Sequence, residues 1–212
     1  MAYFPFFVDI EKQKCLIAGG GIVALRKVEV LLPYGPAITV VSPEFAPELR
    51  ELAEQSGVLL KERDFRMEDL NGADFVVAAT DDPVLNRQIS LTCRENRIPV
   101  NVVDVKDECS FIFPSIVRED DVVIGISSGG KSPTVTQDLK QKIRGVIPEG
   151  YGRLVRQLGE YRDFVKIRVP DLSQRTVIFK RMVDVGRAHG CSLNDRMVEE
   201  LIDQVKNEWM TK

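Results

Sequence analysis

The chain has 212 residues, of which 44% are hydrophobic and 29% are charged, and its formal net charge is −3. This length is sufficient for one large domain or two modest ones, so neither disulfides nor a structural metal is needed to build a core. A slightly negative charge gives no overall attraction to nucleic acids or anionic membranes, and we expect neither as a partner. Any anionic ligand must therefore be bound by local features.

The amino-terminal apolar run Tyr3–Phe7 is short, contains Pro5 and is soon followed by Asp9. It is neither a signal-peptide core nor a membrane span, and we expect a cytoplasmic protein. The four cysteines form no C-x-x-C pair, which indicates neither a zinc site nor a disulfide framework. The single histidine, His189, precedes Gly190 and is expected at the exposed end of a helix, not as a catalytic base.

Short apolar runs alternate with amphipathic segments of helical length through the first half of the chain. This pattern predicts βαβ units and an α/β fold with a Rossmann-type parallel sheet. The expected strands are residues 14–18, 37–41, 58–61, 74–79 and 99–103. Most of them are apolar on both faces, so helices should cover both sides of the sheet. One helix is expected over 22–32, and another from Pro83 to about Asn96, capped by Asp81 or Asp82.

The pattern changes after Asp104. Residues 111–117 and 122–126 resemble two strands of a β-hairpin, and a glycine-rich loop, residues 127–133, then opens a helix. From residue 148 the chain has helical periodicity that is broken at Pro170 and Gly190. The predicted division is a Rossmann domain over residues 1–113, a small middle region of hairpin and helix over 114–147, and a helical carboxyl-terminal subdomain over 148–212.

A glycine-rich turn joins the first strand to the first helix. In the spacing Gly19-x-Gly21-x-x-Ala24, the first glycine permits a tight turn and the second brings backbone close to a pyrophosphate. The small third residue lets the helix pack on the strand, and the helix N-terminus offers free N–H groups to an anion. Glycines in a turn can also be turn residues and no more, but the strand and helix on either side favour a dinucleotide site.

Ligands of open α/β sheets bind outside the carboxyl ends of the strands. In this sequence those positions are Gly19, Ser42, Thr80 and Asp104. Ser42 replaces the Asp or Glu that usually holds the adenosine ribose. A serine can still contact a ribose hydroxyl, and no arginine stands beside it in the sequence to receive a 2′-phosphate, so the pattern favours NAD over NADP.

Three further positions have both a chemical and a structural interpretation. Asp104 follows an apolar strand and could act as a general base or contact a metal ion, or it could cap a turn. Ser128 and Lys131 could bind an anion or belong to a flexible turn. The doublet Arg26-Lys27 is expected to be a solvated helix face, with Arg26 near enough to the crevice to contact an acidic ligand.

Five blocks, in order along the chain, resemble the precorrin-2 dehydrogenase and sirohydrochlorin ferrochelatase module of the siroheme synthase family. They are residues 6–9, 19–27, 78–86, 101–104 continuing through 110–117, and 126–133. Together these blocks are far more specific than a glycine fingerprint alone. The resemblance covers nearly the whole chain.

The resemblance implies NAD-dependent oxidation of precorrin-2 to sirohydrochlorin, and in bifunctional members the insertion of ferrous iron to give siroheme. Asp104 matches the family's aspartate for proton handling in both steps. The implied nucleotide-binding residues are Gly19, Gly21, Ile22, Val23, Ser42, Pro43 and Thr80. Ser128 falls near the implied tetrapyrrole site, where Lys131 could pair with a substrate carboxylate.

The resemblance also implies a homodimer whose interface is made by residues 111–147 and the helical tail. No resident metal site is expected, and any iron bound during insertion would be held transiently near Asp104. The alternative function is an NAD-binding sensor domain without turnover, which would need neither Asp104 nor the 127–133 loop. A sugar or amino-acid dehydrogenase would need a catalytic Lys or His pair that is not obvious here.

Overall fold

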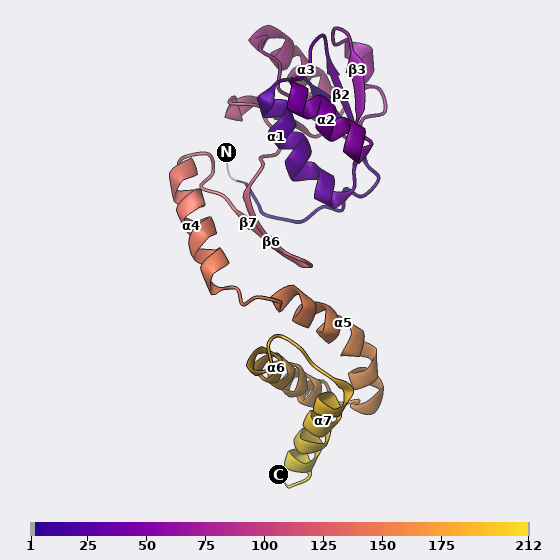
Figure 1. Cartoon of the computed structure of the whole chain (residues 1–212), viewed down its shortest axis with the longest axis vertical. Helices are drawn as coiled ribbons and strands as arrows, with labels where there is room; N and C mark the ends of the chain where they lie inside the picture. Colours follow the sequence, from indigo (N-terminus) through magenta and orange to yellow (C-terminus); the bar gives the residue numbers. More distant parts are fainter. Residues whose placement is uncertain (1–2, 212) are drawn as a thin grey trace. The chain divides into compact units, whose positions relative to one another are not determined.

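The computed structural model describes residues 3–211 and divides into two compact units, residues 1–113 and 114–212 (Figure 1). Residues 1, 2 and 212, which lie at the ends of the predicted first and last domains, are outside the described part. The further division of the second unit near residue 147 stays a prediction. Each unit is described by itself.

The first unit contains a five-stranded parallel sheet with the order β3-β2-β1-β4-β5. Its strands are β1 (Lys14–Ala18), β2 (Ala37–Ser42), β3 (Leu59–Glu62), β4 (Phe75–Ala78) and β5 (Val100–Val102). All five lie where the apolar runs predicted them, with ends that differ by at most one residue. The predicted Rossmann-type sheet is therefore confirmed.

Helices cover both faces of this sheet, as the two-sided apolar strands predict. They are α1 (Ile22–Leu31), α2 (Pro47–Ser56) and α3 (Pro83–Glu95) (Figure 1). Within β1, Ile17 packs in the cluster under α1 and α2, whereas Leu16 and Ala18 pack in the cluster under α3. Fully burying a side chain such as Ile17 contributes about 1.5–3 kcal/mol, so the two layers hold the sheet.

The second unit begins with the antiparallel pair β6 (Ser115–Glu119) and β7 (Val122–Ile126). The hairpin is confirmed, but the expectation that its first strand starts at residue 111 is wrong. Phe111 and Phe113 instead pack against the core of the first unit, where the Phe111 ring lies 6.4 Å from that of Phe75. Burial of two aromatic rings outweighs the strand propensity of this segment.

Four helices complete the second unit: α4 (Pro133–Val146), α5 (Tyr151–Arg168), α6 (Leu172–Ala188) and α7 (Asp195–Met210). The last three share a core that includes Leu154, Ile178, Met182 and Val198. His189 ends α6, is exposed, and has its Nδ1 2.8 Å from the Val185 carbonyl oxygen, which agrees with its predicted place at a helix end.

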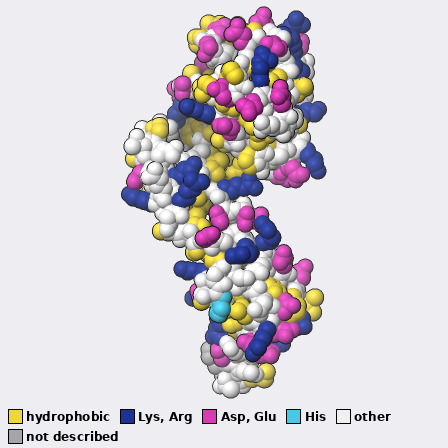
Figure 2. Space-filling model, in the orientation of Figure 1, with side chains coloured by type: hydrophobic (Ala, Val, Ile, Leu, Met, Phe, Trp, Pro, Cys, Tyr) yellow, Lys and Arg dark blue, Asp and Glu magenta, His cyan; other side chains and the backbone are white. Residues whose placement is uncertain are grey.

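In the part of the chain from residue 3 to residue 211, no helix has the length and apolar character to cross a membrane. All four cysteines are buried free thiols. On the face shown in Figure 2, acidic and basic side chains are interspersed over both units. An anionic ligand must therefore be bound by particular groups and not by a broad charged surface.

We predict opposite effects for two glycine-to-alanine substitutions within α5. A Cβ on Gly152 would lie 2.5 Å from Asp120 Cβ and 2.6 Å from the Glu119 carbonyl oxygen, whereas a Cβ on Gly159 meets nothing within 4 Å. Gly152→Ala should lower the free energy of unfolding by about 1–3 kcal/mol because the hairpin turn must move away. Gly159→Ala should raise it by up to about 1 kcal/mol through helix propensity. Urea unfolding followed by circular dichroism measures both, and equal effects would contradict the close contact.

Candidate functional site

The carboxyl ends of the strands lie level along one edge of the sheet. Ala18 of β1 is in register with Val41 of β2 on one side and with Ala78 of β4 on the other. The predicted site positions lie at these strand ends: Ser42 is the last residue of β2, and Gly19, Thr80 and Asp104 come one or two residues after β1, β4 and β5. The strand order reverses between β1 and β4, which is the place where open α/β sheets bind ligands.

The glycine turn has two different structural requirements. Gly19 has φ +106°, its N–H donates to the Val41 carbonyl oxygen at 2.9 Å, and a Cβ there would overlap the carbonyl of Ala79. Gly21 has an ordinary φ of −81°, and a Cβ there would point into open space. Gly19 is thus required by the packing of the sheet edge, whereas the absence of a side chain at Gly21 keeps the space in front of the helix free.

The N-terminus of α1 is not capped by a side chain. Its first N–H groups, including those of Ile22 and Val23, therefore have no partner within the helix and can bind an anion. By contrast, α3 is capped by Asp82, whose carboxylate accepts from Val84 N at 2.8 Å and Leu85 N at 3.2 Å. The uncapped helix beside two glycines fits the pyrophosphate of a dinucleotide.

Ser42 and Pro43 mark the end of β2. Ser42 is only 8% exposed, and among residues 3–211 its hydroxyl makes no hydrogen bond to the protein. Pro43, the next residue, is exposed. A hydroxyl at this position is available to a ribose, as the sequence indicated.

Thr80 is held in place by Asn86, a residue that the sequence analysis did not single out. The Asn86 Oδ1 accepts from Thr80 N at 3.2 Å and from its Oγ1 at 2.7 Å, and the Asn86 Nδ2 donates to Thr80 O at 2.8 Å. Asn86 is buried on α3. The sequence could have indicated this role, because Asn86 lies on the apolar face of an amphipathic helix and a buried amide needs hydrogen-bond partners.

Asp104 follows β5 in the left-handed region, with φ +62°. It is exposed, and within the described residues its carboxylate takes part in no hydrogen bond or ion pair. The alternative that Asp104 caps a turn is wrong, because the adjacent 3-10 turn Lys106–Glu108 has no side-chain cap. A left-handed aspartate with a free carboxylate at the ligand edge is typical of a functional position.

Cys109 holds the turn that contains Asp104 through hydrogen bonds to the backbone. The Cys109 Sγ accepts from Val102 N at 3.2 Å and donates to Val105 O at 3.3 Å. Asn101, buried in β5, donates to Phe111 O at 3.0 Å. Burial raises the pKa of the Cys109 thiol, so this side chain is neutral and structural.

Lys27 lies close to Asp104 and is not on a solvated face. It is half-buried on α1, with its Nζ 4.0 Å from the centroid of the Phe113 ring. Burial lowers the pKa of Lys27, and the negative charge of Asp104 partly opposes that shift. The prediction of a solvated face is right for Arg26, which is exposed, and wrong for Lys27, because the chain returns at Phe113 to cover it.

Ser128 and Lys131 belong to the second unit, whereas the other predicted site residues belong to the first. The Ser128 hydroxyl donates to Ser132 O at 3.1 Å and accepts from Ser132 N at 2.9 Å, which closes the loop. Lys131 is exposed. The loop is thus an ordered turn, and the binding roles of both residues stay predictions.

The reversed strand order, the glycine turn and the uncapped helix define a dinucleotide-binding domain of the Rossmann type. The model of one protein family, described as "Putative NAD(P)-binding", matches residues 6–115. The chain belongs to this family.

Similar proteins are known. The siroheme synthase of Nitrosospira multiformis is 45% identical over 86% of this chain and 40% of its own length. The siroheme synthase of Thioalkalivibrio sulfidiphilus is 40% identical over 87% of this chain and 38% of its own length. The chain thus spans about 40% of the length of these curated relatives. The solved structure of SirC, precorrin-2 dehydrogenase, has the same fold, with a TM-score of 0.73, 23% identity, and coverage of 97% of this chain and 100% of that one.

We predict that Gly21→Ala weakens dinucleotide binding without affecting the fold. The backbone at Gly21 suits alanine and the added methyl group meets no protein atom within 4 Å, but it enters the space in front of α1. The affinity for NADH should fall by about tenfold or more, an energy of at least about 1.4 kcal/mol. NADH fluorescence titration and thermal unfolding measure the two effects. An unchanged affinity would show that the nucleotide does not approach this glycine.

Proposed function

We propose that this chain catalyses the NAD-dependent oxidation of precorrin-2 to sirohydrochlorin. The observation that carries the proposal is Asp104, an exposed carboxylate without a protein partner, held in a left-handed turn at the ligand edge of a dinucleotide-binding sheet. The similarity to siroheme synthases and the fold shared with a precorrin-2 dehydrogenase support it. A sensor domain is not favoured, because a protein that binds NAD without turnover does not require such a carboxylate.

In this reaction the macrocycle loses two hydrogens, one as a hydride and one as a proton. NAD⁺, when bound, supplies the hydride acceptor. The Asp104 carboxylate takes the proton, and it is free to do so because none of residues 3–211 forms a hydrogen bond or ion pair with its oxygens. The products are sirohydrochlorin, NADH and one proton, which Asp104 releases to solvent.

The other residues bind and orient the two reactants. The pyrophosphate would be held by Gly19, Gly21 and the first turn of α1, with Ile22 and Val23. Ser42 would contact the adenosine ribose, and Pro43 and Thr80 would complete the nucleotide site. Ser128 and Lys131 would contact the tetrapyrrole and one of its carboxylates. Lys27, fixed against Phe113, would contribute a positive charge that interacts electrostatically with Asp104.

The same carboxylate can serve the insertion of ferrous iron as a second substrate, because metal insertion removes two protons from pyrrole nitrogens. Within residues 3–211, no three His, Cys, Asp or Glu side chains are grouped closely enough to hold a metal ion. Iron would therefore be bound transiently near Asp104 and by the macrocycle nitrogens. A test for insertion without NAD separates this activity from dehydrogenation.

We also propose a homodimer formed through the middle region, in the cytoplasm. The apolar residues Val135, Leu139 and Val146 are exposed on α4, and β6–β7 is a two-stranded sheet, which by itself is marginally stable in water. Burial of this surface against a second copy would stabilise both. The four free thiols suit a reducing compartment.

We predict that Asp104→Asn abolishes oxidation but not cofactor binding. Asparagine tolerates the left-handed backbone, so the substitution removes the base and keeps the turn. Turnover of precorrin-2 should fall by about 100-fold or more, measured as the rise in NADH and sirohydrochlorin absorbance, with NADH affinity unchanged. Full activity in the variant would exclude Asp104 as the base. If the wild type produced neither product, the proposed function itself would be wrong.

We predict that Lys27→Met reduces turnover while leaving the protein at least as stable as the wild type at pH 7. Burial lowers the pKa of Lys27, so its charged form is disfavoured in the folded state. This penalty is present below the lowered pKa and disappears as the pH rises to the unfolded value of about 10.4. The difference in unfolding free energy between variant and wild type should therefore decrease between pH 7 and high pH. A large loss of stability at pH 7 would instead assign Lys27 a structural role.

A further inference from the structure

Two arginines lie at the strand next to the end of β2: Arg63 follows β3, and Arg50 of α2 pairs with the last residue of β3. Arg63 directly follows β3, and its backbone N–H donates to the Ser42 carbonyl oxygen at 3.0 Å. Glu62, in register with Ser42, pairs with Arg50 of α2. The expectation that no arginine stands beside Ser42 therefore holds for the sequence neighbours but not for the neighbouring strand.

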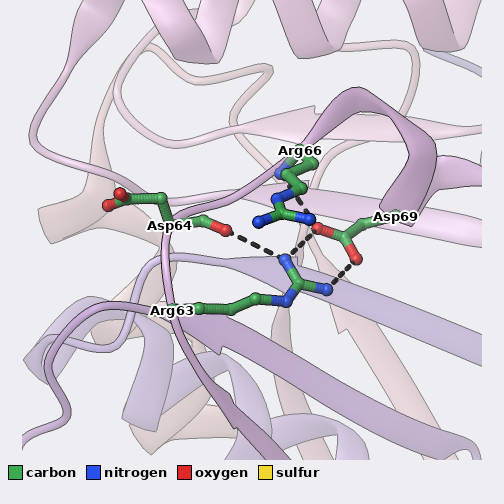
Figure 3. Close-up of polar contacts among 4 residues, drawn as sticks. All are labelled: Arg63, Asp64, Arg66 and Asp69. Atoms are coloured by element: carbon green, nitrogen blue, oxygen red, sulfur yellow. Dashed lines mark hydrogen bonds and ion pairs between the residues drawn. The ribbon is translucent and has the colours of Figure 1, made fainter.

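The side chain of Arg63 forms a bidentate pair with the carboxylate of Asp69 (Figure 3). Its Nη1 donates to Asp69 Oδ2 at 2.8 Å and its Nη2 to Asp69 Oδ1 at 2.5 Å, and Nη1 also donates to Asp64 O at 2.9 Å. Asp69 accepts in addition from Arg66 N at 2.9 Å, and its side chain is only 7% exposed. The hydrogen bonds from Arg63 lower the pKa of Asp69, so this pair is ionised and stable at neutral pH.

Arg50 of α2 forms a similar bidentate pair with Glu62, the last residue of β3. Its Nη1 donates to Glu62 Oε2 at 3.1 Å and its Nη2 to Glu62 Oε1 at 2.5 Å. This pair is more exposed, with 55% of the Glu62 side chain accessible, so water and salt weaken it. Both guanidinium groups at the end of β3 thus use their bidentate face for a carboxylate of the protein.

We propose that these two ion pairs make the nucleotide site selective for NAD over NADP, with Asp69 as the stronger determinant. The inference rests on the nucleotide site of the proposed function. A 2′-phosphate at the end of β2 is normally bound by a nearby arginine. Here Arg63 could bind it through its bidentate face only by leaving Asp69, which would become a buried carboxylate without this arginine. Glu62, in register with Ser42, adds a second negative charge at this end of the sheet.

The test is equilibrium binding of NADH and NADPH to the full chain, followed by cofactor fluorescence without any tetrapyrrole. The wild type should bind NADH more tightly. Asp69→Asn removes the charge that holds Arg63 but keeps an acceptor for Arg66 N, and it should tighten NADPH binding by about tenfold, the effect of one charge-assisted hydrogen bond. NADH affinity should change less than about twofold. Adding Arg63→Met to this variant should remove the gain.

A matched control uses Glu208→Gln, which breaks the bidentate Arg181–Glu208 pair between α6 and α7 and should leave the NADPH-to-NADH ratio unchanged. Glu62→Gln, at the exposed pair, should shift the ratio in the same direction by about threefold, and it keeps the test decisive if Asp69→Asn does not fold. Unchanged ratios in the folded variants, or a gain that persists without Arg63, would overturn the inference. Selective NADH binding without precorrin-2 turnover would contradict the proposed function alone.

Discussion

The close contact between Gly19 and the carbonyl of Ala79 is the constraint on which the site depends. Because no side chain fits between them, β1 and β4 end level and the turn after β1 passes directly over the edge of the sheet. This geometry places Gly21 at the N-cap of α1, which has no side-chain cap, and brings the backbone of Thr80 next to Gly19. The apolar layers above and below the sheet stabilise the arrangement but do not determine where a ligand binds.

The position of Asp104 depends on a second set of contacts, made on the underside of its turn. Cys109 satisfies the backbone of Val102 and Val105, so the aspartate needs no hydrogen bond of its own to hold the loop. The carboxylate is therefore free for chemistry, although the backbone at Asp104 is in a region that aspartate adopts infrequently. The half-buried charge of Lys27, which interacts electrostatically with Asp104, is likewise unfavourable for stability.

The strands, their parallel arrangement and the edge that carries Gly19, Ser42, Thr80 and Asp104 were all predictable, because apolar runs and strand ends are local properties. The partners of these residues were not. Asn86 reaches Thr80 from the next helix, and Lys27 is buried by Phe113, which lies far along the chain. The strand predicted from residue 111 failed for the same reason, since periodicity does not show that two aromatic rings pack against a distant core.

Carboxylates at this edge of the sheet differ in role because they differ in partner. Asp69 and Glu62 are each held by an arginine, so they act on a ligand only by keeping that arginine occupied. Asp104 interacts electrostatically with Lys27. In the described part of the chain it forms no ion pair with this lysine. Composition and spacing do not distinguish these three acidic residues. Their pairing in the fold does, because two are held by arginines and Asp104 is not. The chemistry of the site thus follows from which charges the fold leaves unpaired.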